Sequence, residues 1–372
     1  MKGASALFGP RGRANVPAMT ANIIREDRII YTVVLVHAAV AVAAIWSTGV
    51  SSAFAYLAYF PTWPFVFLVF FPILYGLLVT LRVVHRLDRR RVTATRLILS
   101  DKRMAHFGAG LVLLCAIMVF QGTFTSFKNA FPTWWGGFPF DVFQADLDKS
   151  LHFGSDPWHY LYAIGESGIV RAFIEWNYNQ GWFILCFSAL FWVAVSYEAR
   201  AIRTRYFLCY VLLWIIVGNV FAGLFLSAGP AFYGNVTGDT VRFASQMAFL
   251  GESSEGMHSA VRMQHYLWAT QQRGEAGFGS GIAAFPSMHV ALVTLNALFL
   301  YAHSRKAGLL AFGYVGLIIA SSVYLAWHYA IDGYFAVVVT VIVYAFTRRL
   351  VGASGAKRDT PASFWPARNL PA

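Results

Sequence analysis

The sequence has 372 residues, of which 58% are hydrophobic and only 12% charged, and its mean hydropathy is +0.55. This composition excludes a water-soluble domain built around one core and is typical of a polytopic membrane protein. The formal net charge of +12 would suit nucleic-acid binding in a soluble protein. Here the basic residues occur in short segments between apolar runs, which is the positive-inside pattern of membrane proteins. We therefore expect no nucleic-acid partner.

The first 105 residues predict a tail, two membrane spans and a basic loop. Residues 1–28 are polar and Gly-rich and indicate a partly disordered cytoplasmic tail. Residues 29–105 begin with a stretch, 29–81, that lacks Asp, Glu, Lys and Arg and is long enough for two helices of about 20 residues each. Residues 82–103 hold eight Arg and Lys against two Asp, so we expect this loop to be cytoplasmic.

Three further spans are expected in the middle of the chain, at residues 104–127, 177–197 and 206–226. The segment between the first two, 128–176, mixes acidic and aromatic residues and predicts an extracytoplasmic loop with interfacial helices. An outer aromatic belt at the membrane surface is expected from five tryptophans: Trp134, Trp135, Trp158, Trp176 and Trp182.

The last part of the chain predicts a second extracytoplasmic loop at 227–280 and spans at 290–303, 309–327 and 331–346. Residues 348–372 indicate a short cytoplasmic tail. The fold class is thus all-α, a polytopic membrane helix bundle with about eight transmembrane helices and both termini on the cytoplasmic side.

Two polar clusters stand at the outer ends of the last apolar runs. One contains His289, and the other contains His328 and Asp332. Two histidines and an acid that converge at a membrane surface indicate a functional site. His328 and Asp332 are four residues apart, so on a helix they share a face and can form a hydrogen bond. A carboxylate on one imidazole nitrogen leaves the other free to attack or to bind a metal.

The residues just before His289 suit the start of a helix. Proline is tolerated in the first turn, as Pro286 would be, and Ser287 can cap the helix. Backbone N–H groups at such a helix start attract an anion such as phosphate.

The segment 286–289 (Pro-Ser-Met-His), followed by Ser321 and by 328–332 (His-Tyr-Ala-Ile-Asp), resembles the second and third motifs of the PAP2 (type 2 phosphatidic acid phosphatase) superfamily. The His-Tyr-x-x-Asp form, with Ser-Ala-Gly-Pro at 227–230, is most similar to the inositol phosphorylceramide synthase branch. The resemblance covers roughly 120–345 and implies a PAP2-like catalytic domain at 106–347.

The resemblance implies a role for each motif residue. His328 would attack phosphorus and become phosphohistidine, and Asp332 would orient it and stabilise its developing positive charge. His289 would protonate the leaving oxygen and later activate the acceptor. Ser287 and nearby backbone N–H groups would hold the phosphoryl oxygens. The scheme needs no metal and no other cofactor.

The sequence departs from the family pattern at two arginines. The third motif of the family has Arg directly after its Ser, where this chain has Ser322. The first motif has Lys and, seven residues on, Arg-Pro, whereas Lys128 is followed seven residues on by Trp135. Other cations must then clamp the phosphate, and Lys128 is the first choice, with snorkelling to lipid headgroups as its alternative role. The further candidates in the outer loops are Arg242, Arg262 and Arg273.

A substrate pocket is expected beside these residues. Gly229, Pro230 and Tyr329 are predicted to line it, because small residues at the end of the fifth span leave room for a lipid. An ordinary helix terminator is the alternative interpretation of Gly229 and Pro230.

The sequence therefore predicts a membrane phosphotransfer enzyme that acts on a lipid phosphate or phospholipid headgroup donor. With water as acceptor it is a phosphatase, and with a lipid hydroxyl it is a headgroup transferase. We expect it in a bacterial inner (plasma) membrane, with its site facing the periplasm or exterior. The alternatives are a zinc-dependent membrane hydrolase and a non-catalytic lipid transporter or binding protein.

Overall fold

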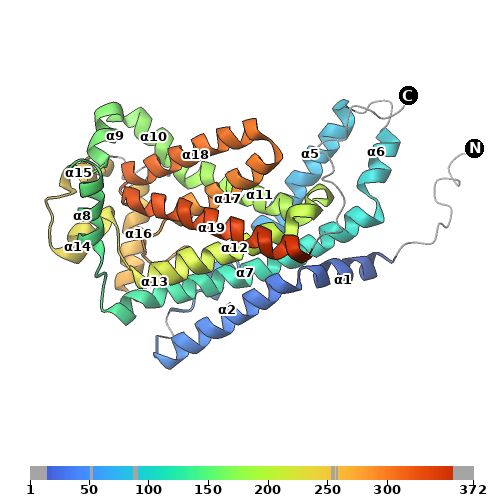
Figure 1. Cartoon of the computed structure of the whole chain (residues 1–372), viewed down its shortest axis with the longest axis horizontal. Coiled ribbons are helices and arrows are strands. Elements are labelled where there is room, and N and C mark those ends of the chain that lie inside the picture. The colour runs from blue at the N-terminus through green and yellow to red at the C-terminus, as the bar shows by residue number, and fades with distance from the viewer. Residues whose placement is uncertain (1–14, 51–52, 87–90, 253–255, 257–258, 355–372) are drawn as a thin grey trace, which may run out of the picture.

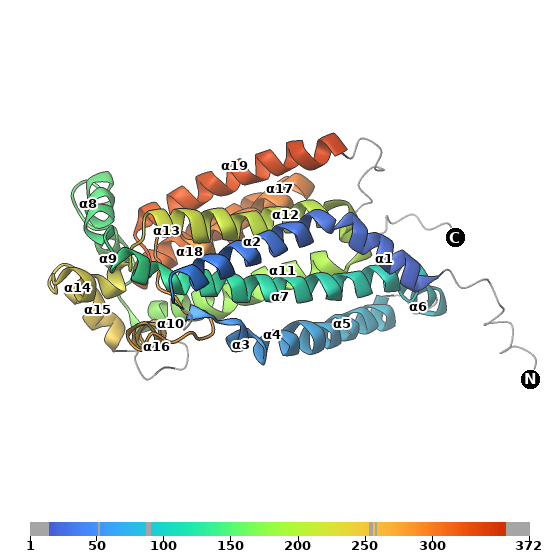
Figure 2. The same ribbon diagram turned by 90° about the horizontal axis from the view of Figure 1, so that it is seen from below.

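The computed structural model describes residues 15–50, 53–86, 91–252, 256 and 259–354, and within these residues it is all-helical, with no strand. The long helices lie side by side along a common axis, and short helices lie across one end of the bundle (Figures 1 and 2). The first and last described helices, α1 (Val16–Glu26) and α19 (Ala330–Ser354), leave the bundle at its opposite end.

Seven helical segments of the described residues are long and apolar enough to cross a membrane. Four of them are single helices: Arg28–Ser47 (α2), Asp101–Trp135 (α7), Arg305–Tyr324 (α18) and Ala330–Val351 within α19. The other three are each made of several consecutive helices. Tyr56–His85 comprises α3 (Tyr56–Tyr59), α4 (Thr62–Pro64), the π-helical Phe65–Phe70 and α5 (Phe71–Arg86); Gly168–Val195 comprises α10 (Gly168–Trp176), the π-helical Asn177–Gly181 and α11 (Trp182–Val195); and Tyr197–Leu224 comprises the 3₁₀ turn Tyr197–Ala199, α12 (Arg200–Ile215), the π-helical Ile216–Phe221 and α13 (Ala222–Leu224).

An eighth apolar helix, α17 (Met288–His303), has 16 residues, fewer than the roughly 20 that cross a bilayer. It is short because the motif segment before it is extended rather than helical. The predicted polytopic membrane helix bundle is confirmed, and the chain is an integral membrane protein. The expected sixth span corresponds to this shorter helix.

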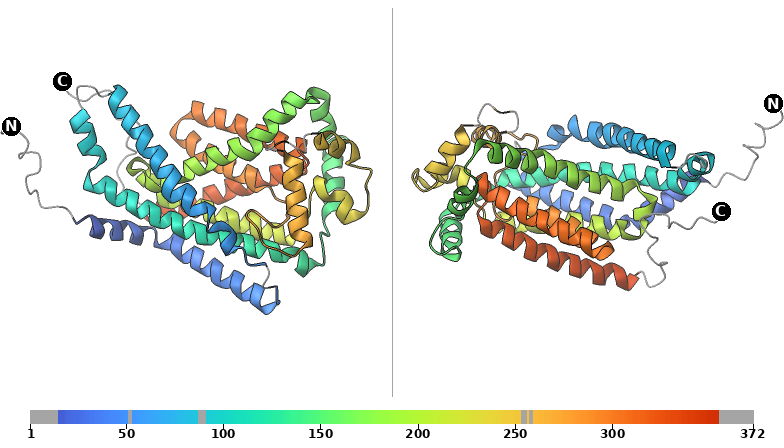
Figure 3. Two further views of the ribbon diagram at one scale, coloured as in Figure 1. Left: turned by 180° about the vertical axis from the view of Figure 1, so that it is seen from behind. Right: turned by 90° about the horizontal axis from the view of Figure 1, so that it is seen from above.

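Helix α17 lies inside the bundle and packs against α18, α19 and α12. On the other side of the bundle, α7 packs against α1, α2 and α11 (Figure 3). A hydrogen bond of 2.9 Å between His37 of α2 and Asn219 joins two of the spans. Buried polar pairs of this kind hold transmembrane helices together because lipid offers no hydrogen-bonding partner.

Short helices form a cap over the end of the bundle at which α17 and α19 begin (Figures 1 and 2). They are α8 (Asp141–Leu151), α9 (Trp158–Gly165), the 3₁₀ turn Pro230–Phe232, α14 (Tyr233–Thr237), α15 (Ala244–Gly251) and α16 (Ala260–Gln272). The two polar loops predicted from the sequence therefore meet at one end of the bundle. At the other end of the bundle lie α1, α6 (Arg91–Ile98) and the 3₁₀ turn Tyr197–Ala199.

Three expectations are corrected. The tail is not disordered from residue 16, because α1 forms there and packs against α7; residues 1–14 lie outside the described residues. The C-terminal helix continues to Ser354, beyond the expected start of a tail at 348, and 355–372 are not described. Trp158 and Trp182 are buried rather than part of a lipid-facing belt, since each packs against other aromatic rings.

A buried ion pair fixes the junction between α1 and α2. Asp27 lies between these helices, and its Oδ2 is 2.8 Å from a guanidinium nitrogen of Arg203 on α12. Both side chains are 2% exposed, and the Thr204 hydroxyl donates to the other carboxylate oxygen of Asp27 at 2.9 Å. Neither charge can reach water, so each depends on the other.

We expect Asp27→Asn to lower the free energy of unfolding by about 3–5 kcal/mol, because it leaves the Arg203 charge buried and unpaired. Thermal unfolding in detergent measures this. The matched control is Glu198→Gln, which breaks the partly exposed Arg103–Glu198 pair and should cost less than about 1 kcal/mol. Equal losses of unfolding free energy in the two variants would show that burial of the Asp27–Arg203 pair does not increase its contribution to stability.

Candidate active site

His328 lies in a non-helical segment between α18 and α19, and Asp332 lies in the first turn of α19. The two side chains form a hydrogen bond of 3.1 Å between Nδ1 and Oδ2. An ionised carboxylate can only accept, so Nδ1 carries the proton and Nε2 is left without it. The predicted pair is present, but His328 precedes the helix instead of sharing its face with Asp332.

The pairing follows from how α19 begins. Tyr329 is the residue just before the helix, and its N–H donates to the same Asp332 oxygen at 3.1 Å. An acid at the third helical position commonly reaches back to the N–H at the helix start in this way. Asp332 is fully buried, so a single carboxylate both starts the helix and orients the imidazole.

The second motif begins α17 with the predicted serine cap, but Pro286 precedes the cap and is not in the first turn of the helix. Ser287 is the cap residue, with its hydroxyl accepting from the N–H of Val290 at 3.5 Å. The Ser287 N–H donates to the backbone carbonyl of Asp332 at 3.2 Å. The starts of α17 and α19 are therefore tied together directly, and His289 in the first turn of α17 interacts electrostatically with His328.

Two aromatic rings enclose His289, and the sequence did not identify either as part of the site. Tyr178 stacks on the imidazole with ring centroids 4.4 Å apart and an angle of 13°. The Trp182 ring lies at 4.0 Å, and its indole N–H donates to the His289 carbonyl at 3.0 Å. The buried Tyr178 hydroxyl lies beside Ser287 but forms no hydrogen bond within the described residues. A polar group in this position can donate to a bound ligand.

Lys128 is on α7, close to its end at the cap. It interacts electrostatically with His289. The loop before α17 packs closely against it, because a Cβ on Gly281 would lie 3.1 Å from the Lys128 Cγ. Among the residues that the structure describes, Lys128 has no hydrogen-bond or ion-pair partner. Its ammonium group can therefore bind an anion next to the histidines.

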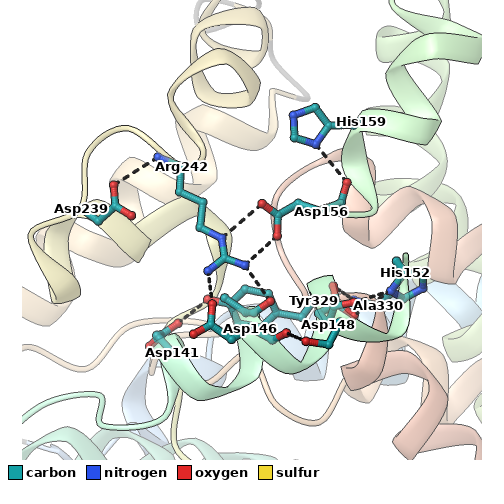
Figure 4. Close-up of polar contacts among 12 residues, drawn as sticks. Asp141, Asp146, Asp148, His152, Asp156, His159, Asp239, Arg242, Tyr329 and Ala330 are labelled. Atoms are coloured by element: carbon teal, nitrogen blue, oxygen red, sulfur yellow. Dashed lines mark hydrogen bonds and ion pairs between the residues drawn. The ribbon is translucent and has the colours of Figure 1, made fainter. Parts of the chain in front are cut away.

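The other candidate cations are placed differently. Arg242 binds two carboxylates, at 2.8 Å from Asp156 and 2.6 Å from Asp146, and so is already neutralised (Figure 4). Arg273 is exposed and pairs with Glu275 at 2.8 Å. No described contact brings either arginine to the histidines.

The remaining position of interest is that of the missing family arginine, Ser322. It is buried, and its hydroxyl donates to the Ile319 carbonyl at 2.8 Å. Its own carbonyl accepts from the N–H groups of Trp327 at 2.9 Å and of His328 at 3.3 Å. This residue shapes the loop of His328 and adds no charge.

The last candidate cation, Arg262, is an exposed residue of α16.

The segment 227–230 joins the two motif loops. Ser227 accepts from the Ala284 N–H at 2.8 Å, and the Ala231 N–H donates to the Ala326 carbonyl at 2.9 Å. Gly229 has a φ of +94°, and a Cβ there would lie 2.8 Å from the carbonyl oxygen of Trp327. Only glycine fits this close approach.

Gly229, Pro230 and Tyr329, which were expected to line a pocket, are in the framework that holds the loops. Pro230 is buried at the start of the 3₁₀ turn, and the Tyr329 hydroxyl donates to Asp141 at 2.8 Å. Their role in a substrate pocket stays a prediction.

Two acidic residues of α8 hold this framework, and the sequence analysis did not single them out. Asp141 accepts from the N–H groups of Ala228 at 2.7 Å and Gly229 at 2.9 Å, besides the Tyr329 hydroxyl. Burial raises the pKa of Asp141 to about 6, although these hydrogen bonds oppose the shift. The signal for this role is the spacing of Asp141 and Asp148, seven residues apart on one helix face.

Asp148 caps α19 from outside the helix. Its two oxygens accept from the N–H groups of Ala330 at 3.0 Å and Ile331 at 3.1 Å (Figure 4). Burial raises the pKa of Asp148. The first turn of α19, which carries Asp332, thus depends on a carboxylate that is 182 residues away along the chain.

Two buried glutamines complete the support from the cap. Gln246 donates to the Val323 carbonyl at 2.8 Å, and Gln264 donates to the Leu325 carbonyl at 2.9 Å. They satisfy backbone groups at the end of α18, just before His328.

The PAP2 superfamily profile matches residues 144–346, which is more than half of the chain. The chain belongs to the PAP2 superfamily. Searches of curated proteins and of solved structures gave no match. The matched PAP2 region includes both histidines and Asp332, whereas Lys128 and Asp141 precede its first residue. PAP2 membership indicates a phosphatase-type enzyme in a membrane.

A metal centre was the alternative use of these residues. Within the described residues of this PAP2 protein, no group of three or more His, Cys, Asp or Glu side chains is placed to hold a metal ion. The starts of α17 and α19 bring together an imidazole with a free nitrogen and a second imidazole, with Lys128 and the first N–H groups of α17 nearby, and this arrangement suits an anionic group.

We expect Asp148→Ala to lower the free energy of unfolding by about 1–3 kcal/mol, because two buried N–H groups lose their acceptor. Amide hydrogen exchange should also become faster in the first turn of α19. The control is Asp146→Ala on the same helix, whose carboxylate is 63% exposed and should contribute less than about 1 kcal/mol. Unchanged exchange in α19 would contradict the capping role of Asp148.

Proposed function

We propose that this PAP2 protein transfers phosphoryl groups of membrane lipids through a phosphohistidine on His328. The observation that carries the proposal is the arrangement around this imidazole. Asp332 holds Nδ1 at 3.1 Å and so presents Nε2 as the nucleophile. His289 and Lys128 interact electrostatically at the same site.

The reaction has two steps. The Nε2 lone pair of His328 attacks phosphorus, the ester P–O bond breaks, and His289, which takes up a proton when the anionic substrate binds, gives it to the leaving oxygen. The acceptor hydroxyl then loses its proton to His289 and attacks phosphorus, and the P–N bond breaks. The free histidine is regenerated, and no oxidant or reductant is needed.

Charge on the phosphoryl oxygens is balanced by Lys128 and by the start of α17 at Ser287. Helix N-termini favour anions because their N–H groups and dipoles point outward. The first N–H groups of α19 already bind Asp332 and Asp148, so the start of α19 positions His328 beside α17 and does not itself bind the phosphate. This arrangement supports one lysine as a substitute for the missing family arginines.

The acceptor distinguishes a phosphatase from a transferase. We favour a headgroup transferase similar to inositol phosphorylceramide synthase, because the chain shares its His-Tyr-x-x-Asp form and departs from the arginines of the PAP2 phosphatase motifs. We place the enzyme in a bacterial plasma membrane with the site on the outer side. The orientation is supported by the basic segments, such as α6 and the start of α18, which lie at the end of the bundle away from the site (Figure 1). Basic segments favour the cytoplasmic side of a membrane.

The purified protein should act on lipid phosphates or phosphodiesters, and His328→Ala should abolish turnover. Asp332→Asn should lower kcat by about 10³–10⁴-fold, because it removes the charge that orients the imidazole. Mass spectrometry of the products reads the acceptor: free phosphate without added acceptor identifies a phosphatase, and a new phospholipid formed only with diacylglycerol or ceramide identifies a transferase. Unchanged turnover in His328→Ala would overturn the mechanism and favour a non-enzymatic lipid-binding role.

Lys128→Met should lower kcat by about 10²–10³-fold, since a cation on the transferred group stabilises the transition state. The same assay on Arg273→Met provides the control, because this arginine is exposed and paired with Glu275. A loss in Arg273→Met that equals the loss in Lys128→Met would mean that the phosphate lies elsewhere in the cap.

A further inference from the structure

Helix α8 has three sides of different chemistry. The side that faces the protein is polar and buried and consists of Asp141, Gln144 and Asp148. A second side carries apolar residues four positions apart that are 60%, 39% and 59% exposed: Phe143, Leu147 and Leu151. These three residues are called the α8 stripe. The third side is exposed and carries Asp146 and Lys149 together with Val142, which is 51% exposed, and Ser150 lies at its border with the α8 stripe.

This pattern is the reverse of a helix on a water-soluble protein, which buries its apolar face. The residues of α8 that bind the protein are acids and an amide, and the large apolar residues point outward. A helix that is polar on two sides and apolar on the third suits the boundary between lipid and water.

Contacts on either side of α8 show which way the stripe points. Gln144, which precedes Leu147 by three residues and Leu151 by seven, lies where the buried side of the helix meets the stripe. Its amide donates to the carbonyl of Phe225 at 2.9 Å, at the end of the span that finishes with α13. The stripe therefore lies on the side of the membrane spans.

The opposite side of α8 faces the rest of the cap. The Ala145 carbonyl accepts from Arg242 at 2.8 Å, and Asp146 pairs with the same guanidinium (Figure 4). Asp239, which precedes α15, accepts from the Arg242 N–H. This charged network needs water or other polar groups around it, so it belongs on the side away from lipid.

The stripe continues the lipid-facing surface of the spans. Phe140, just before α8, packs against Trp135 at the end of α7 and against Phe225, with ring centroids at 5.9 and 5.6 Å. Trp135 and Phe225 are 48% and 39% exposed. Figures 1 and 2, two views at right angles, both show α8 crossing the direction of the long helices. It therefore lies along the membrane surface if those helices cross the membrane.

We propose that α8 is an interfacial membrane helix whose Phe143, Leu147 and Leu151 insert into the lipid at the level of the active site. The occupant of the apolar side is the bilayer itself. The polar side of the same helix binds Gly229 through Asp141 and the start of α19 through Asp148. Insertion of the stripe thereby holds the site at the bilayer surface, from which it takes its substrate. The effect on turnover rests on the function proposed above, but the position of α8 does not.

The position can be tested without any activity. A nitroxide label is attached to Phe143→Cys, and to Lys149→Cys as the control on the exposed side away from the stripe, in a Cys115→Ser background. Cys115 is the exposed native thiol, and the other two are buried. In nanodiscs of phosphatidylcholine and phosphatidylglycerol, we expect the label at 143 to be accessible to oxygen and protected from a water-soluble nickel chelate, with the reverse at 149.

Two outcomes would overturn the proposal. Access of the nickel chelate to the label at 143 would place the stripe in water. Protection of this label from both reagents would mean that a protein, such as a second copy of the chain, covers the stripe.

The effect on turnover is tested with Leu147→Glu and, as the matched control, Val142→Glu, which adds the same charge on the exposed side away from the stripe. For a long-chain lipid phosphate in nanodiscs, kcat/KM should fall at least about tenfold in Leu147→Glu only, because a carboxylate in the apolar boundary is costly. A short-chain, water-soluble lipid phosphate should react at the wild-type rate in both variants, and this also excludes misfolding. An equal loss of kcat/KM on both substrates in Leu147→Glu would overturn the proposed link between the stripe and access to lipid substrates. Absence of turnover in the wild type as well would count against the proposed function and leave the label experiment to decide the position of α8.

Discussion

The carboxylate of Asp141 is the contact on which the geometry of the site depends. Through three hydrogen bonds it joins the segment of Gly229 to the loop of His328, and its own helix supplies Asp148 to cap α19. Backbone N–H groups at the end of a membrane helix bundle have few partners, and leaving them buried and unpaired costs free energy. Two acids on one short helix supply those partners, so the loops and the histidines are held in one arrangement.

The same constraint bears on how a site with few charges can attract an anion. The helices α17 and α19 begin side by side, and their first residues are tied through the Ser287 N–H. The start of α17 contributes positive potential there without adding a side-chain charge, whereas the start of α19 is capped by Asp332 and Asp148. A lysine in contact with the loop at Gly281 adds a full charge. The chain therefore has a physical basis for binding an anion although it lacks the arginines of its superfamily.

Enclosure of the second imidazole has a consequence for proton transfer. His289 lies between the rings of Tyr178 and Trp182, and these rings restrict its rotation and limit water around it. A general acid works best when it is held at the reacting oxygen and shielded from competing water. The stacking rings come from Gly168–Val195, a span that carries neither motif. The α8 stripe similarly comes from outside the motifs.

The sequence by itself determined the features that are local. Long apolar runs and basic breaks determine the spans, since lipid requires each span to satisfy its own backbone. Spacing within a few residues determined the Ser287 cap and the His328–Asp332 pair. Only the tertiary structure decided that Asp141 and Asp148 hold the loops, that Tyr178 and Trp182 enclose His289, and that Arg242 is neutralised by Asp146 and Asp156. These roles arise from contacts between segments distant along the chain, and a charge or ring in a sequence carries no mark of the partner that folding brings to it.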